Sequence, residues 1–302
     1  MSIPTALKTL LKLRGPNPLP NPGLEKLAPI FLTTLKEASA HKAENGWLAV
    51  ATATFLAANS PSVVGDLYRF ASHKMDCNGT AGSGSPTSVS LPSTEPFPLK
   101  ERTRRAAQMR EAGLKSVVFV GVPKVINSLA ALTESLEDDV KAALTTIPHR
   151  TLLNESLGME KVAARGHKLF ESIYHPHTLK LLAKLGKYHP DFPGHIITYE
   201  YGSLLSDPVG WSSRAEAVIN RALTSAVGVA CLRASGGVGP QLTSHVYGLL
   251  KARDFGEELS EGDQWLASAD GATWVLGVVD RLVDSLHVPD TLEQNGASQR
   301  SE

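Results

Sequence analysis

One short segment, residues 240–248 (PQLTSHVYG), combines residue types that could do acid–base chemistry. Proline is tolerated in the first turn of a helix, so Gln241 and His245 are predicted four residues apart on one helical face. Gly248 would leave a gap beside that histidine. Histidine has an ordinary pKa near neutrality, so His245 could act as a general base or a hydrogen-bond donor. A partly buried histidine bonded to a backbone carbonyl is the open alternative.

A carboxylate could support this histidine. Glu216 and Asn220 are predicted to share a face of a helix over residues 211–232. A return of the chain through the glycine-rich residues 234–239 would let Glu216 face His245 and orient or charge its imidazole. The alternative is a first-turn acid that only stabilises the helix N-terminus. Tyr201 is a further candidate donor, although core packing is the commoner use of tyrosine.

Several histidines and acids cluster along the chain, namely His175, His177, His189, Asp191, His195 and Glu200. Imidazole and carboxylate groups are suitable ligands for zinc or iron. Prolines next to three of these histidines indicate loops, and the HExxH motif is absent. We therefore expect no metal site, and we keep His195 as a candidate residue of a substrate pocket.

Composition and charge exclude several classes of protein. The 302 residues include 30 Lys+Arg, 30 Asp+Glu and only two cysteines, Cys77 and Cys231. A neutral chain has no general attraction for nucleic acid or anionic lipid, so neither is an expected partner. Two separated cysteines form neither a disulfide framework nor a four-cysteine zinc site, and Cys231 lies in an apolar helix typical of a core.

Cellular location is predicted from the same features. The uncharged run 45–65 contains polar residues and Pro61, which favour a buried helix over a membrane span. We expect an intracellular protein, cytoplasmic in the first instance. The basic, acid-free first fourteen residues also resemble a mitochondrial presequence, so a mitochondrial location is the alternative.

Helical periodicity runs through most of the chain, and no series of alternating strands is present, so the predicted fold class is all-α. The β-like run 117–122 follows a helical stretch without a break, and we interpret it as buried helix. The predicted helices span residues 24–41, 47–59, 62–73, 99–121, 123–136, 161–173, 179–185, 211–232, 240–251 and 271–285.

The predicted organisation is an N-terminal extension (1–23), one helical domain (24–286) and a polar tail (287–302). An acid, a long apolar helix, a Gly/Pro turn and a second helix occur around Glu111 and again around Glu216, which predicts two repeated halves, 24–150 and 151–286. Chance similarity of pattern is the alternative. Residues 77–98 are rich in Ser, Gly, Pro and Thr, which predicts a disordered insertion.

Residues 189–207 (HPDFPGHIITYEYGSLLSD), 239–250 (GPQLTSHVYGLL) and 270–282 (DGATWVLGVVDRL) resemble the carboxymuconolactone decarboxylase and alkylhydroperoxidase-D-like superfamily, particularly its fungal two-half members. Residues 47–71 and 115–132 resemble the same proteins, so the resemblance covers most of residues 47–282. It implies an alkylhydroperoxidase-D-like helical domain.

The resemblance also implies site residues. The peroxidase branch has a helix-borne acid, a Cys-x-x-Cys pair and a histidine, and here Glu216 and His245 resemble the acid and the histidine. Val238 and Gln241 occupy the cysteine positions, so thiol peroxidase chemistry is not expected. The decarboxylase branch, which lacks the cysteine pair, does acid–base work on small lactones with a histidine at the position of His245.

Together these features predict a cofactor-independent lyase, isomerase or cyclase that acts on a small organic molecule, as in fungal secondary metabolism. The expected partners are that small molecule and further copies of the chain in a homo-oligomer. The alternative is a non-catalytic helical oligomer of an organelle with a decayed site. The predicted catalytic residues are His245, Glu216, Gln241 and Tyr201, and the predicted pocket residues are Gly248, Asn220 and His195.

Overall fold

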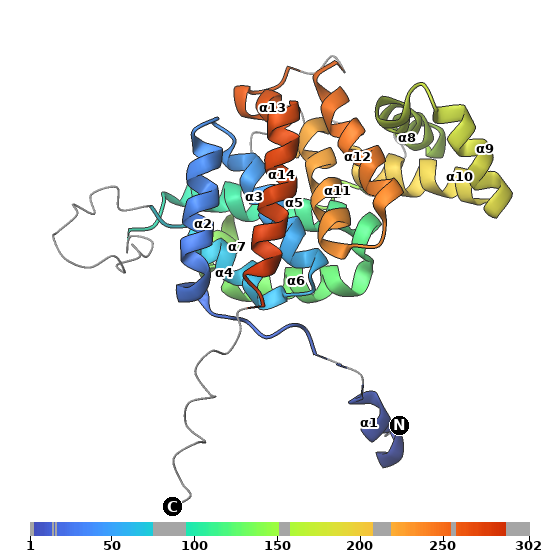
Figure 1. Ribbon diagram of the computed structural model, residues 1–302. Coiled ribbons are helices and arrows are strands. Elements are labelled where there is room, and N and C mark those ends of the chain that lie inside the picture. Colours follow the sequence, from blue (N-terminus) through green and yellow to red (C-terminus); the bar gives the residue numbers. More distant parts are fainter. Residues whose placement is uncertain are drawn as a thin grey trace, which may run out of the picture.

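The computed structural model describes residues 3–13, 15, 17–74, 95–150, 158–207, 219–254 and 258–287. These residues form helices and no strand, with one isolated β-bridge between His73 and Pro96 (Figure 1). The all-α prediction is therefore confirmed. Within the described ranges, no helix is both long and apolar enough to cross a membrane.

Each predicted helix has a counterpart, and only the predicted helix 211–232 begins at a clearly different residue. The elements are, in chain order, α1 (Thr5–Leu11), α2 (Leu24–Ser39), α3 (Glu44–Ala57), α4 (Pro61–Ala71), α5 (Leu99–Val120), α6 (Val122–Ser135), α7 (Asp138–Ala143), α8 (Met159–Tyr174), α9 (Thr178–Tyr188), α10 (Phe192–His195), η1 (Ile196–Leu205), α11 (Arg221–Ser235), α12 (Gly239–Leu250), η3 (Lys251–Asp254), α13 (Glu261–Leu266) and α14 (Ala269–Asp284).

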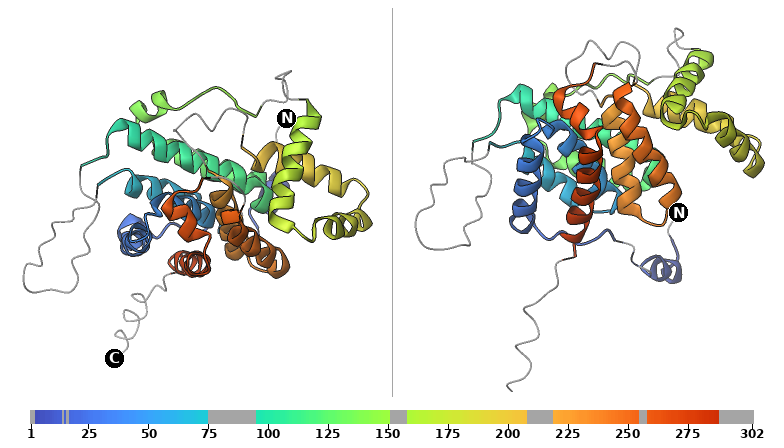
Figure 2. Two further views of the ribbon diagram at one scale, coloured as in Figure 1. Left: turned by 90° about the horizontal axis from the view of Figure 1, so that it is seen from above. Right: turned by 45° about the horizontal axis from the view of Figure 1, so that its top comes forward.

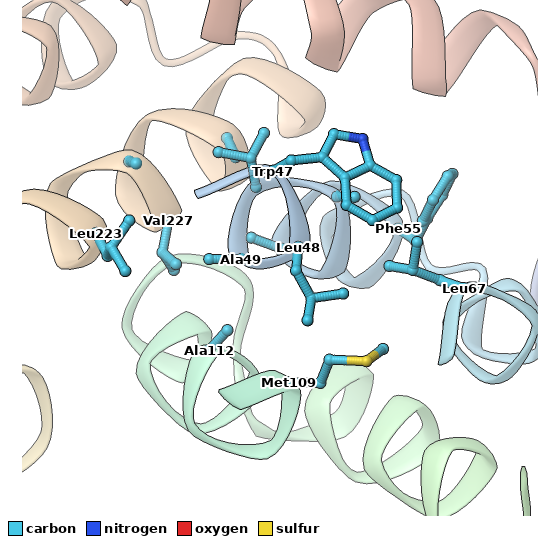
Figure 3. Packing of buried hydrophobic residues seen from close by; sticks show 14 of the residues in the cluster. Trp47, Leu48, Ala49, Phe55, Leu67, Met109, Ala112, Leu223 and Val227 are labelled. Atoms are coloured by element: carbon cyan, nitrogen blue, oxygen red, sulfur yellow. The ribbon is translucent and has the colours of Figure 1, made fainter. Parts of the chain in front are cut away.

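The main core lies around α3 and α11. Both helices are buried on all sides along most of their length, which requires that other helices surround them. Helices α5 and α14 pack against both of them, so residues from both predicted halves share one core. Figure 3 shows this packing at Trp47, Leu48, Ala49, Phe55, Leu67, Met109, Ala112, Leu223 and Val227.

A second, smaller core joins α8 to the π-helix η1. It contains Phe170 and Ile173 of α8 and Ile197, Tyr201 and Leu205 of η1. Helices α8, α9 and α10 lie to one side of the main bundle, on the right in Figure 1 and in both views of Figure 2. Helices α8 and η1 carry two tyrosines of the candidate site, Tyr174 and Tyr201.

Two glycines explain why α8 and η1 lie so close together. A Cβ atom on Gly166 of α8 would lie 1.9 Å from the carbonyl oxygen of Ile197, and one on Gly202 of η1 would lie 2.3 Å from that of Val162. Any larger residue would push the two backbones apart.

The π-helix η1 was not among the predicted helices, because proline and glycine at residues 193 and 194 are typical of a loop.

Two pairs of consecutive helices correspond to the predicted units, but Glu111 lies in the middle of α5 and does not open it. Helices α5 and α6 are joined at Gly121 with a φ of 82°, and α11 leads to α12 through Gly236 and Gly237 with φ values of 65° and 71°. Glycine adopts these left-handed conformations without the steric penalty of a Cβ atom. A twofold relation between the two units stays a prediction.

The disorder predicted over residues 77–98 can be compared with the structure only at residues 95–98, where the prediction is wrong. Residues 75–94 lie outside the described part of the chain, but residues 95–98 are fixed. The backbone N–H of Lys74 donates to the carbonyl of Glu95, and that of Phe97 donates to Ser72, each at 2.9 Å. The guanidinium of Arg105 lies 4.3 Å from the centroid of the Phe97 ring. These contacts hold residues 95–97 against the residues that follow the C-terminal end of α4.

The predicted extension and tail at the two ends of the chain are described only in part. In the predicted extension 1–23, α1 has no buried residue and lies away from the bundle (Figure 1). The predicted polar tail falls outside the described residues from residue 288 onward.

Candidate active site

His245 of α12 is buried between three other helices, with 5% of its surface exposed. Its ring meets the edge of Phe119 from α5 at a centroid distance of 5.1 Å. From α11, a Cβ atom on Gly228 would lie 3.0 Å from His245 Nδ1, so this glycine makes room for the imidazole. Nδ1 is buried and has no hydrogen-bond partner among the described residues.

Two tyrosines lie on the other side of the imidazole. The hydroxyl oxygens of Tyr174 on α8 and Tyr201 on η1 are 2.9 Å apart, and either can be the donor. Tyr174 Oη is also 3.4 Å from His245 Nε2, at the long end of the range for a hydrogen bond. The Tyr174 hydroxyl therefore lies between two groups that can each donate to it or accept from it.

Arg221, the first residue of α11, lies next to this cluster. Its Nε donates to Ser172 Oγ at 2.8 Å, and its Nη2 donates at 2.9 Å to the carbonyl of Gly248, one turn beyond His245. Arg221 is 4% exposed. A buried cation so close to His245 opposes a second positive charge on the imidazole.

Burial and charge set the protonation states of the cluster. Burial, with a contribution from the charge of Arg221, lowers the pKa of His245 to about 4. Burial raises the pKa of Tyr174, although its hydrogen bond with Tyr201 acts in the opposite direction, and burial raises the pKa of Tyr201 well above the usual value. At pH 7, therefore, the imidazole is neutral and both phenols keep their protons.

Two proton arrangements are compatible with a neutral His245. In the first, Nε2–H donates to Tyr174 Oη; where Tyr201 also donates to that oxygen, the Tyr174 proton is free for another acceptor, and where Tyr174 donates to Tyr201 instead, it is not. In the second, Nε2 accepts the proton of Tyr174, which leaves an Nδ1–H donor buried without an acceptor. The first arrangement gives Tyr174 the properties of a general acid whose conjugate phenolate would receive two hydrogen bonds.

A cavity of about 650 Å³ reaches the cluster at Tyr174. It lies between α8 and α9 on one side and α12 on the other, and His245 is not among its lining residues. Tyr174 is thus the group of the cluster that a molecule in the cavity could touch. The cavity is lined by Ile173, Tyr174, Pro176, His177, Lys180, Leu181, Lys184, Ser244, Tyr247 and Lys251.

The structure brings only part of the predicted site together. Tyr201 and His245 belong to one cluster, whereas Gln241 is exposed one turn before the buried His245. The gap predicted at Gly248 is filled, because a Cβ atom there would lie 2.8 Å from Cγ2 of Ile173. The glycine serves helix packing between α12 and α8 and leaves no space for a substrate.

Three other predicted residues lie elsewhere or cannot be placed. Asn220 does not continue a helix from Glu216, since it is the N-cap of α11: its side chain accepts from the N–H of Leu223 at 3.0 Å and donates to Asp263 at 2.8 Å. Glu216 lies outside the described residues. His195 is exposed, with Nε2 3.4 Å from a carboxylate oxygen of Glu200.

Metal-ligating groups and the buried thiol were compared with the sequence predictions over the described residues. They contain no group of three His, Cys, Asp or Glu side chains that could hold a metal ion. Cys231 is fully buried, and burial raises the pKa of its thiol to about 12. A thiol in that state is not a nucleophile at neutral pH.

The sequence analysis missed Tyr174 and Arg221. Each had a detectable signal, because Phe170 and Tyr174 lie four residues apart on the apolar face of α8, and Arg221 is the only charged residue in the first twelve residues of an apolar helix. A charge in such a helix indicates a buried polar network.

Comparison with known proteins gives one distant relative. The chain is 25% identical to Peroxisomal protein 2 of Saccharomyces cerevisiae over 273 residues, which cover 79% of this chain and 93% of the relative. No family model and no solved structure matches.

Proposed function

We propose that the protein is a cofactor-independent, non-redox enzyme that uses Tyr174 as an acid on a small organic molecule, as a lyase, an isomerase or a cyclase. The observation that carries this proposal is the position of the Tyr174 hydroxyl. Tyr174 lines the cavity, and its hydroxyl oxygen is within reach of both Tyr201 Oη, at 2.9 Å, and His245 Nε2, at 3.4 Å.

Each residue has a defined role in this proposal. A substrate carbonyl oxygen gains negative charge when a bond to a neighbouring carbon breaks, shifts or forms. Tyr174 donates a hydrogen bond or its proton to that oxygen. Tyr201 and the Nε2–H of His245 stabilise the phenolate until the proton returns. A pericyclic reaction would need only the hydrogen bond and a cavity that selects the reactive conformation.

The low pKa of His245, about 4, decides what the imidazole does in this scheme. A neutral histidine at pH 7 is a hydrogen-bond donor or acceptor and is not itself a strong acid. It therefore supports Tyr174 and does not protonate the substrate directly. The first proton arrangement, with the proton on Nε2, is the one that the proposal requires.

The resemblance of residues 189–207 and 239–250 to the carboxymuconolactone decarboxylase and alkylhydroperoxidase-D-like superfamily supports non-redox acid–base chemistry. Both segments supply a residue of the cluster, Tyr201 from the first and His245 from the second. Membership of that superfamily is part of the proposal. The homo-oligomer that the sequence predicts is also part of the proposal.

A second candidate function is a non-catalytic helical protein of an organelle. Two observations favour it: the relative is called a peroxisomal protein, and His245 does not line the cavity.

Whichever function is correct, we propose a peroxisomal location in place of the predicted cytoplasmic one, because the similarity to the peroxisomal relative spans most of both chains. Fluorescence microscopy of the tagged chain beside a peroxisomal marker tests this location.

A turnover experiment separates the two functions. The wild-type protein is incubated in deuterium oxide with a library of small lactones, keto acids and enones, and mass spectrometry records new products and deuterium incorporation. Tyr174→Phe removes the acid and should lower any turnover by roughly a hundredfold or more. Tyr188→Phe is the matched control, because Tyr188 is 66% exposed and lies outside the cluster.

Variants of His245 distinguish the mechanisms. Activity retained in His245→Gln but lost in His245→Ala indicates that a hydrogen bond from this position is sufficient. Activity lost in both indicates that the imidazole takes part in proton transfer. Equal turnover in wild type and Tyr174→Phe would remove Tyr174 from the mechanism, and absence of turnover across the library would favour the non-catalytic function.

A further inference from the structure

The charges around the 650 Å³ cavity are all of one sign. Its ten lining residues include Lys180, Lys184 and Lys251 together with His177, and none of the ten is an aspartate or a glutamate. The chain as a whole has equal numbers of acidic and basic residues, so this wall differs from the average surface. A cavity lined by one sign of charge raises the local concentration of ions of the opposite sign.

Two of these lysines have no anionic partner. Lys180 and Lys184 lie one turn apart on α9, where like charges repel each other. Neither makes an ion pair or a side-chain hydrogen bond with any residue that the structure describes. In contrast, Lys251 is held in place, because its Nζ donates to the carbonyls of Ile173 at 3.1 Å and His175 at 2.6 Å. Two lysines without a described partner and one lysine with a fixed ammonium group therefore line the same cavity.

The rest of the cavity wall is apolar. Ile173 and Leu181 lie on the side formed by α8 and α9, and Tyr247 of α12 lies opposite, with 60% of its surface exposed. An exposed aromatic ring opposite aliphatic side chains suits the apolar body of a ligand. A small inorganic ion would leave this part of the cavity unfilled.

We infer that the cavity binds an organic anion with an apolar body, with the anionic group at Lys180 and Lys184 and the body between Leu181 and Tyr247. This inference rests on the proposed function, since it names the substrate class of the same cavity. Tyr174 lines the cavity as well, so a ligand fixed at the lysines could present a carbonyl oxygen to its hydroxyl.

A matched pair of fluorescent probes tests the inference. The first is 1-anilinonaphthalene-8-sulfonate, an apolar body with one negative charge, and the second is N-phenyl-1-naphthylamine, which has the same body without the charge. The anion should bind more tightly to the wild-type protein. The double variant Lys180→Ala/Lys184→Ala should weaken binding of the anion by roughly fivefold, as expected for two exposed charge pairs, and leave the neutral probe unchanged.

Two further variants test whether the loss of affinity for the anionic probe comes from the charges of the cavity lysines. Lys187→Ala removes a lysine of α9 that does not line the cavity, and it should leave the anion's affinity unchanged. The double variant Lys180→Arg/Lys184→Arg keeps both charges and should retain binding. Equal affinity of the two probes, or equal weakening by Lys187→Ala and by the Lys180→Ala/Lys184→Ala pair, would overturn the inference.

The same assay separates this inference from the proposed function. Selective binding of the anion without any turnover would uphold the ligand class and contradict the enzyme. Turnover that is restricted to uncharged library members and indifferent to Lys180→Ala/Lys184→Ala would uphold the enzyme and contradict the ligand class.

Discussion

The hydroxyl oxygens of Tyr174 and Tyr201 lie 2.9 Å apart, although the two residues belong to different helices, α8 and η1. Their rings also meet edge-on, with centroids 6.2 Å apart. The contact depends on the close approach of the two helix backbones at Gly166 and Gly202. The same pair of helices therefore supplies a small apolar core and the polar side of the candidate site.

The Tyr174–Tyr201 hydrogen bond should be measurable as a coupling energy. Tyr174→Phe leaves the Tyr201 hydroxyl buried without this partner and should lower the free energy of unfolding by about 1–3 kcal/mol. The double variant Tyr174→Phe/Tyr201→Phe should lose clearly less than the sum of the two single variants. Urea unfolding of the four proteins measures these energies. Strictly additive losses would show that the hydroxyl groups do not interact.

Close packing of α8 against η1 gives a second prediction. Gly166→Ala places a methyl group against the Ile197 carbonyl oxygen and should destabilise the protein by about 1–3 kcal/mol or more. Gly194→Ala is the matched control, because a Cβ atom there would have no neighbour within 4 Å. Hydrogen exchange should become faster in α8 and η1 before it changes in α3. An unchanged exchange pattern in Gly166→Ala would contradict the packing described.

The pKa of His245 gives a pH dependence of stability. It is about 4 in the folded protein and 6.5 as its ordinary value, so between these pH values the unfolded chain binds more protons. The stabilisation linked to neutral His245 is present above pH 6.5 and is lost as the pH falls toward 4, with a maximum of about 3 kcal/mol.

Urea unfolding at several pH values tests this linkage. His245→Gln should flatten the fall in stability between pH 6.5 and 4, while Thr243→Ala, an exposed residue of the same helix, should keep the wild-type slope. A fall of the same steepness in His245→Gln would mean that other groups cause it.

Cys231 should be inert in the folded protein. Burial raises the pKa of its thiol to about 12, so the reactive thiolate is scarce at neutral pH. In a Cys77→Ser background, 5,5′-dithiobis(2-nitrobenzoic acid) should label Cys231 only after unfolding, and the protein should show no thiol-dependent peroxidase turnover. Rapid labelling of the native protein, or peroxide consumption abolished by Cys231→Ser, would refute this.

Much of the fold could be predicted from the sequence, because most helices carry their own signals. The apolar run of α3 and the Pro and Gly residues around α12 mark helices without knowledge of their neighbours. The π-helix η1 has no such local signal. It is stabilised by contacts of Gly202 and Ile197 with α8, and these depend on residues more than thirty positions away.

The candidate site was less predictable for the same reason. His245 could be selected by residue type alone, whereas the position of Tyr174 on the apolar face of α8 marks it only as a core residue, and its role follows from the fold, which places its hydroxyl 3.4 Å from a residue 71 positions later. Gln241 was predicted from helical spacing. It lies one turn before the buried His245, but its own side chain is exposed. Gly248 was predicted to border a gap that Ile173 fills.

The most direct test of the account is the state of the His245 imidazole beside Tyr174. Nitrogen-15 NMR of histidine-labelled protein reports which ring nitrogen carries the proton and at which pH the ring becomes charged. We expect a neutral ring at pH 6, a proton on Nε2, and a shift of the Nε2 signal in Tyr174→Phe but not in Tyr188→Phe. A charged ring at pH 6, or an Nε2 signal that does not respond to Tyr174→Phe, would contradict it.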